Sequence, residues 1–175
     1  MNKLISLDDL FKLKIASLLN SERQIAAGYP ILARNCSSVQ LQAILGQRTG
    51  YAYKRSLLLE MLLPGTEGQV EGPSPVKAIL EEGNHWIQLQ EESLPAVLDA
   101  TIASIISSIG HLNIANYGSA HCYASLLNRQ DTLVFYQLLQ GEVNADRELS
   151  RLIEVILNPQ AAEAGRKKLD LVLQE

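Results

Sequence analysis

Apolar side chains recur along this chain at the three- and four-residue spacing of amphipathic helices, and no stretch alternates as a half-buried β-strand would. The pattern predicts four long helices, over residues 7–35, 39–63, 94–127 and 131–157. A short helix is predicted to begin near Ser74, with Pro75 in its first turn. The tail, residues 159–175, has a helical pattern and is polar enough to lie on the surface.

Polar residues, prolines and glycines mark the expected ends of these helices. Ser6 and Asp9 have the spacing of a capping box, and Ser37 or Ser38 is the expected N-cap of the second helix. Pro30 is predicted to kink the first helix or to open a turn. Residues 65–74 are predicted to form the one long loop, and the Asn-Pro pair at residues 158–159 is predicted to break the chain after the last long helix.

Together these elements predict an all-α fold, an antiparallel four-helix bundle. The short extra helix lies between the second and third long helices, and a helical extension follows the fourth. We expect residues 1–158 to form the bundle and residues 159–175 to form a helical tail packed on it or near it.

The composition of the chain argues against nucleic-acid binding, export and membrane insertion. The chain has 175 residues, of which 47% are apolar, and a formal net charge of −4, so a globular domain is expected and a nucleic-acid footprint is not. No apolar run has the form of a signal peptide or a membrane span, and the two cysteines, Cys36 and Cys122, match neither a metal finger nor a disulfide framework. A cytoplasmic protein without a nucleic-acid or membrane partner is therefore predicted.

Four segments, in order, resemble the YciE/YciF family of ferritin-like stress proteins. They are DLFKLKIASLLNSERQIAAGYPILA at residues 9–33, AILEEGN at 78–84, HLNIANYGS at 111–119 and EVNADRELSRL at 142–152. The resemblance implies a ferritin-like bundle that can hold two metal ions between its helices, a stress or defence setting, and a homodimer paired through helix faces. A protein partner of unknown identity is also expected.

The resemblance also assigns the family's metal-ligand positions to residues of this chain. It places acidic residues at Glu22, Glu142 and Asp146. At the other matched positions this chain has residues that are not metal ligands of the family. These vacated positions are Gln47, Gly50, Gly110 and Asn113.

A two-metal centre needs carboxylates from all four helices, and this chain lacks them. No Asp or Glu occurs between residues 35 and 59, so the loss on the second helix does not depend on the alignment. We therefore predict a metal-free, non-enzymatic bundle that acts through protein association, with no cofactor and no nucleophile–base motif or phosphate loop. The alternative is a metal-binding protein or weak metal-dependent oxidoreductase that holds iron or manganese with Glu22, Glu142, Asp146 and His121.

Each candidate residue also has a structural interpretation. Glu22 can be an inward carboxylate that is paired with Arg48 or Arg55, or hydrogen-bonded to Tyr51 or Tyr53. His121 can be a core histidine with satisfied hydrogen bonds.

The acidic pair and the glycines leave further alternatives open. The pair of Glu142 and Asp146 can lie on a solvated face or in the interior, where it would need a cation or a proton. The space near Gly50, Gly110 and Gly118 can be a pocket for a small apolar ligand, or it can simply allow close helix packing.

Overall fold

A computed structural model of the protein describes residues 5–63, 74–88 and 93–173, and in this part of the chain every regular element is a helix. The predicted loop therefore lies almost entirely outside the described residues. The elements are α1 (Leu7–Arg34), α2 (Val39–Met61), α3 (Pro75–Gln88), α4 (Pro95–Leu126), α5 (Thr132–Leu152), the π-helical turn η1 (Ile153–Leu157) and α6 (Asn158–Val172).

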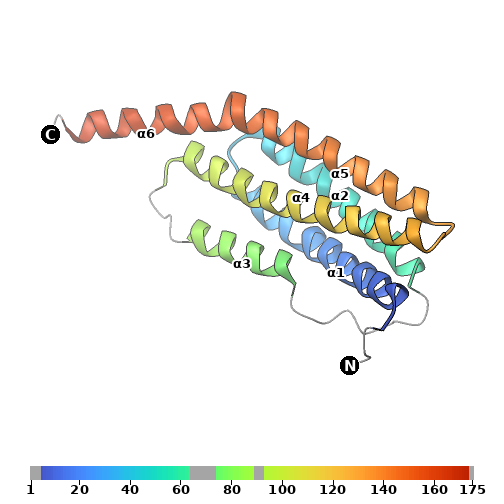
Figure 1. The fold of residues 1–175 in the computed structure, drawn as a ribbon. Coiled ribbons are helices and arrows are strands. Elements are labelled where there is room, and N and C mark those ends of the chain that lie inside the picture. Colours follow the sequence, from blue (N-terminus) through green and yellow to red (C-terminus); the bar gives the residue numbers. More distant parts are fainter. Residues whose placement is uncertain (1–4, 64–73, 89–92, 174–175) are drawn as a thin grey trace.

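Helices α1, α2, α4 and α5 form the predicted bundle (Figure 1). The closest contacts are between α1 and α2 and between α4 and α5, while α1 and α4 join these two hairpins. Neighbouring helices run antiparallel, and α2 and α5 approach each other least closely. Helix α3 lies outside the bundle against α1 and α4, where Gly28 and Gly83 allow close packing: an added Cβ would lie 2.6 Å from Leu80 and 2.5 Å from Ile105, respectively.

Side chains fix the predicted helix starts. Ser6 and Asp9 form the capping box at the start of α1, and the Ser38 hydroxyl accepts the Leu41 N–H at the start of α2. Between these helices, the buried Asp99 carboxylate of α4 accepts the backbone N–H groups of Ser37 and Ser38 at 2.8 and 2.9 Å. Asp99 therefore ties the α1–α2 connection to α4, a role that its sequence position did not suggest.

The structure bears on two predicted interruptions. Pro30 opens no turn, because α1 continues past it to Arg34, and a kink is the alternative that stays a prediction. The predicted break at Asn158 and Pro159 is wrong: the chain passes from α5 through η1 directly into α6. A proline ring inside a helix clashes with the carbonyl group four residues earlier, and a π-helical turn before Pro159 shifts the backbone bonding so that the helical path can continue.

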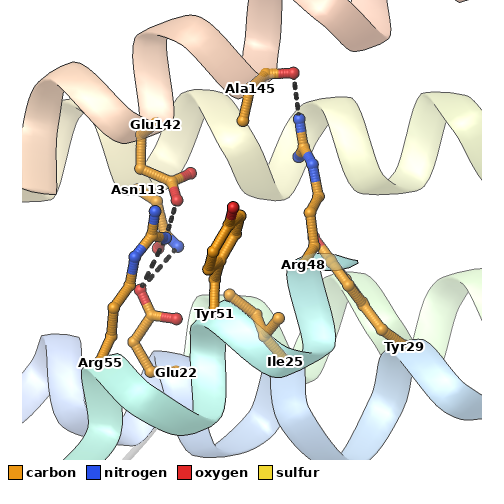
Figure 2. A pocket seen from close by; sticks show the side chains of 9 residues that line it. All are labelled: Glu22, Ile25, Tyr29, Arg48, Tyr51, Arg55, Asn113, Glu142 and Ala145. Atoms are coloured by element: carbon orange, nitrogen blue, oxygen red, sulfur yellow. Dashed lines mark hydrogen bonds and ion pairs between the residues drawn. The ribbon is translucent and has the colours of Figure 1, made fainter. Parts of the chain in front are cut away.

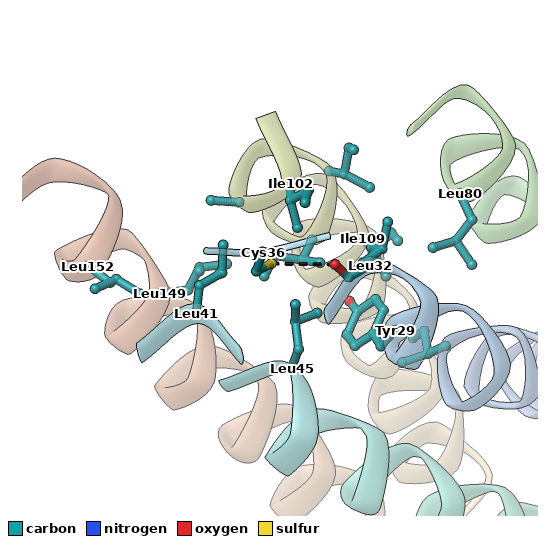
Figure 3. Packing of buried hydrophobic residues seen from close by; sticks show 14 of the residues in the cluster. Tyr29, Leu32, Cys36, Leu41, Leu45, Leu80, Ile102, Ile109, Leu149 and Leu152 are labelled. Carbon is teal, nitrogen blue, oxygen red and sulfur yellow. Dashed lines mark hydrogen bonds between the residues drawn. The ribbon is translucent and has the colours of Figure 1, made fainter. Parts of the chain in front are cut away.

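The core is divided into two apolar clusters at the two ends of the bundle. One contains Phe11, whose ring meets Phe135 edge-on at 5.5 Å between centroids. The other contains Tyr29, Leu45 and Ile102 (Figure 3). A layer of polar side chains, with Glu22, Arg55 and Glu142, lies between these two clusters.

Helix α4 supplies apolar side chains to both clusters. By length and composition it is the one helix in the described part of the chain that could cross a membrane, yet 44% of its apolar window is buried within the bundle. Its apolar character therefore agrees with its place in a protein core. Helix α6 has no buried side chain and extends beyond the end of the bundle (Figure 1).

Candidate functional site: an arginine between two buried carboxylates

A layer of polar side chains crosses the middle of the bundle, and its centre is Arg55 of α2 (Figure 2). The Arg55 Nη1 atom lies 3.6 Å from Glu22 Oε1 of α1 and donates a hydrogen bond to Glu142 Oε1 of α5. Both carboxylates are buried, with 0% and 6% of the residue exposed. One guanidinium group is thus shared by two carboxylates that would otherwise repel each other in a medium of low polarity.

Two residues of α4 complete the surroundings of Glu22. The Tyr117 hydroxyl donates to Glu22 Oε1 at 2.6 Å, and Asn113 Nδ2 donates to the same atom at 3.4 Å. The spacing of four places both side chains on one face of α4. Burial raises the pKa of the Glu22 carboxyl above its usual value, while Arg55 and the Tyr117 hydroxyl act in the opposite direction.

Two aromatic rings lie near the Arg55 guanidinium group. Its central carbon lies 6.0 Å from the centre of the Tyr51 ring and 5.8 Å from the centre of the Tyr117 ring. A guanidinium group is attracted to the faces of aromatic rings. Gly141 of α5 leaves room for the group, since an added Cβ there would lie 3.4 Å from Arg55 Nη2.

A second arginine of α2 occupies the space beside Gly110. An added Cβ at Gly110 would lie 3.4 Å from Arg48 Nη1 and 3.8 Å from Asp146 Oδ1. The Arg48 Nη2 atom donates to the Ala145 carbonyl oxygen at 2.6 Å. The space left by the missing side chain of Gly110 is therefore filled in part by a guanidinium group from α2, across the bundle.

Asp146 lies one helical turn beyond Glu142, at the edge of the bundle. Its Oδ1 atom lies 3.3 Å from Nε2 of the largely exposed His111, without hydrogen-bond geometry. The acidic pair is therefore split: Glu142 is interior, and Asp146 is only partly buried.

The structure corrects the register that was predicted for α2. Gln47 and Gly50 are exposed, and the residues of α2 that line the small cavity in the polar layer are Arg48, Tyr51 and Arg55. A shift of one residue turns a helix position by about 100° about the axis, which is enough to move it from the inside to the outside. Arg55 does pair with Glu22, as the structural interpretation predicted, but the hydroxyl donor is Tyr117 instead of Tyr51 or Tyr53.

His121 and two of the glycines lie apart from this layer. The His121 Nδ1 atom is 3.4 Å from the Thr132 carbonyl oxygen, and its ring lies beside Tyr136 at 5.5 Å between centroids. Gly50 and Gly118 face open space, with no atom within 4 Å of an added Cβ. The structure therefore does not bring the glycines of the predicted apolar pocket around a common cavity.

The donor set does not fit a two-metal centre. Arg55 lies between the two buried carboxylates, and a cation there would be repelled by the guanidinium group. Among the described residues, no group of three His, Cys, Asp or Glu side chains could hold a metal ion. Glu22 Oε2 and Asn113 Oδ1 are buried acceptors without a protein donor, and the adjoining cavity of about 20 Å³ has the size of one water molecule.

Comparisons with known proteins agree with the fold. The crystal structure of the Escherichia coli stress protein YciF is 19% identical and matches 86% of this chain and 96% of that chain, with a TM-score of 0.75. YcfI of Rhodopseudomonas palustris, described as a proposed structural protein, is 21% identical and matches 85% of this chain and 96% of that chain, with a TM-score of 0.72.

No curated protein matches the chain. The family model described as a domain of unknown function, DUF892, matches residues 6–162, which is most of the chain. The protein therefore belongs to the DUF892 family.

Proposed function

We propose that this protein is a metal-free, non-enzymatic member of its family that acts through protein association in a stress-related role. The observation that carries the proposal is the position of Arg55, whose guanidinium group lies between the buried Glu22 and Glu142 carboxylates. In ferritin-like bundles, metal ions neutralise the carboxylates that project into the core. Here an arginine supplies that positive charge.

The arrangement also supports a non-enzymatic role. A redox metal centre needs an open coordination position and a path for substrate, whereas Arg55 is held by two carboxylates and two aromatic rings. The stress-related part of the proposal rests on the likeness to the protein named as the E. coli stress protein YciF.

One observation favours the alternative, a metal-binding protein that uses iron or manganese. Glu22 Oε2 and Asp146 Oδ1 are buried oxygen atoms without a hydrogen-bond donor, and such atoms attract cations. Against this alternative, Arg48 and Arg55 place two positive charges in the same layer. A divalent ion would have to displace at least one of them.

Elemental analysis of the purified, untagged protein tests the proposal. The protein would be measured before and after incubation with ferrous iron, manganese and zinc, each followed by removal of unbound metal. We expect well under one metal ion per chain in every condition. One or more tightly held ions per chain, lost in a Glu22→Gln variant but kept in a Glu163→Gln variant on the exposed surface of α6, would contradict the proposal and support the alternative.

A further inference from the structure

A cleft of about 370 Å³ lies between α3 and α4, on the outer side of α4. Each helix contributes four residues at the spacing i, i+3, i+4 and i+7, which is the spacing of one helix face. The lining residues are Ile79, Glu82, Gly83 and Trp86 of α3 and Thr101, Ser104, Ile105 and Ser108 of α4. The cleft shares no residue with the cavity in the polar layer, so it is a separate feature of the molecule.

The cleft has an apolar part and a polar part. Ile105 is buried and Ile79 is partly buried, so these two side chains form the deeper, apolar lining. Ser104 and Ser108 are exposed, and their short side chains leave space between the helices. The indole ring of Trp86 also lines the cleft, although 49% of this residue is exposed. A ligand in the cleft would therefore meet apolar, aromatic and polar groups together.

The polar groups of the cleft act as hydrogen-bond acceptors toward a ligand. The Thr101 hydroxyl group donates its hydrogen to the Val97 carbonyl oxygen at 2.9 Å, and the Ser108 hydroxyl group donates to the Ser104 carbonyl oxygen at 3.1 Å. The N–H group of the Trp86 indole is directed at Glu82 Oε1, at 3.5 Å. These donors are used within the protein, while the hydroxyl and carboxylate oxygens keep further lone pairs.

The charge of the cleft is negative. Glu82 is the one charged side chain that lines it within the described part of the chain. Lys77 of the same helix lies outside the lining and pairs with the exposed Glu81 at 3.7 Å. Indole rings attract cations as well, through the negative face of the ring. Acceptors, one carboxylate and one indole thus favour a ligand that is positively charged and donates hydrogen bonds.

We propose that the cleft between α3 and α4 binds a small aliphatic amine in its protonated, ammonium form. The ammonium group donates to the Glu82 carboxylate and to the hydroxyl oxygens of α4, beside the Trp86 indole. The aliphatic chain covers Ile79 and Ile105. An anion would be repelled by Glu82, and a sugar would bring both donors and acceptors to a cleft that offers acceptors. This binding function is additional to the association proposed above.

The fluorescence of Trp86 tests the proposal directly, because this residue is the only tryptophan of the chain. The full, untagged protein would be titrated with pentylammonium chloride at constant ionic strength. We expect a change in the tryptophan emission that saturates at millimolar concentrations. 1-Pentanol, which has the same chain without the charge, should give no saturable change. A response to pentylammonium that does not saturate, or an equal response to pentanol, would overturn the proposal.

Two pairs of variants locate the binding site. Glu82→Gln removes the charge and should raise the dissociation constant at least about fivefold. Glu81→Gln is the matched control, because the neighbouring Glu81 carboxylate is exposed and lies outside the cleft. Ser104→Leu fills the cleft and should abolish the saturable change. Ala115→Leu, also on an exposed position of α4 but outside the cleft, should bind as the wild type does.

A readout that does not depend on the indole completes the test. Broadening of the pentylammonium methyl resonance in proton NMR reports binding to the wild type and to Trp86→Leu alike. We expect less broadening with Trp86→Leu, because the ring that attracts the cation is gone. Circular dichroism would show that each variant keeps its helices. Unchanged binding by Glu82→Gln or by Trp86→Leu, or equal losses in the variants and their controls, would overturn the assignment of this cleft.

Discussion

Helix α2 turns two arginines toward the polar layer of the bundle and also carries exposed apolar side chains on its outer face. Arg48 and Arg55 enter the bundle and meet carboxylates and a carbonyl group there. On the opposite side, Val39 and Tyr53 are 73% and 60% exposed. Helix α5 lies across the same polar layer and also turns a charged side chain inward, but this side chain is the carboxylate of Glu142. The difference shows that α2 supplies the positive charge of the layer, while α1 and α5 supply the negative charge.

The largest expected effect comes from the inner face. Arg55→Ala removes the one guanidinium group that separates the Glu22 and Glu142 carboxylates, so two buried charges are left without a counter-charge. We expect the free energy of unfolding to fall by about 3–5 kcal/mol. Urea denaturation measures this loss. Lys54→Ala, at the exposed neighbouring position, should change stability by less than about 0.5 kcal/mol.

Metal binding by Arg55→Ala is a second test of whether Arg55 acts as the internal positive charge. Without Arg55, a divalent cation can restore the lost positive charge between the two carboxylates. Manganese or zinc should therefore raise the melting temperature of Arg55→Ala and leave that of the wild type unchanged. If both proteins responded equally, the ions would bind elsewhere and Arg55 would not be acting as the internal counter-cation.

A smaller loss of stability is expected from a substitution on α4, at the side chain that donates a hydrogen bond to Glu22. Tyr117→Phe removes the hydroxyl group that donates to Glu22 Oε1 at 2.6 Å and leaves the buried ring in place. The cost should be about 1–3 kcal/mol, since a buried carboxylate loses one of its donors. Tyr123→Phe, also on α4 but only partly buried, is the control in the same denaturation experiment. A similar loss in both variants would mean that the Tyr117 hydroxyl has no special role.

The sequence was sufficient to predict the bundle but only part of the polar layer. Long amphipathic periods and the capping residues at Ser6 and Ser38 are local signals, and both were read correctly. The continuation of the helix through Pro159 was missed, because a π-helical turn is not visible in the apolar pattern.

The family's metal-ligand positions alone did not identify which residues of α2 face the interior. Aligning Gln47 and Gly50 with lost ligands placed the wrong side of α2 inward, since one residue of register decides the face. The arginines themselves were the better signal. Arg48 and Arg55 are seven residues apart, which places them on one face of α2. The other helices of the bundle carry carboxylates at core positions, and these are the natural partners of two inward arginines.

The smallest expected effect is a difference in pH dependence. Because burial raises the pKa of Glu22 in the folded protein, folding takes up a proton on this group. Its contribution to stability is therefore greatest below the ordinary carboxyl pKa of 4.5 and is lost as the pH rises from there through the raised folded value. Glu22→Gln cannot titrate, so its unfolding free energy should fall less than that of the wild type as the pH rises above 4.5.

Urea titrations at several pH values would measure this difference in slope between the wild type and Glu22→Gln. Glu163→Gln serves as the control, because Glu163 is exposed and pairing with Lys167 lowers its pKa instead of raising it. Its pH dependence should follow that of the wild type above pH 4.5. If Glu22→Gln also followed the wild type, the Arg55 guanidinium would outweigh burial, and the inner face of α2 would hold Glu22 ionised throughout.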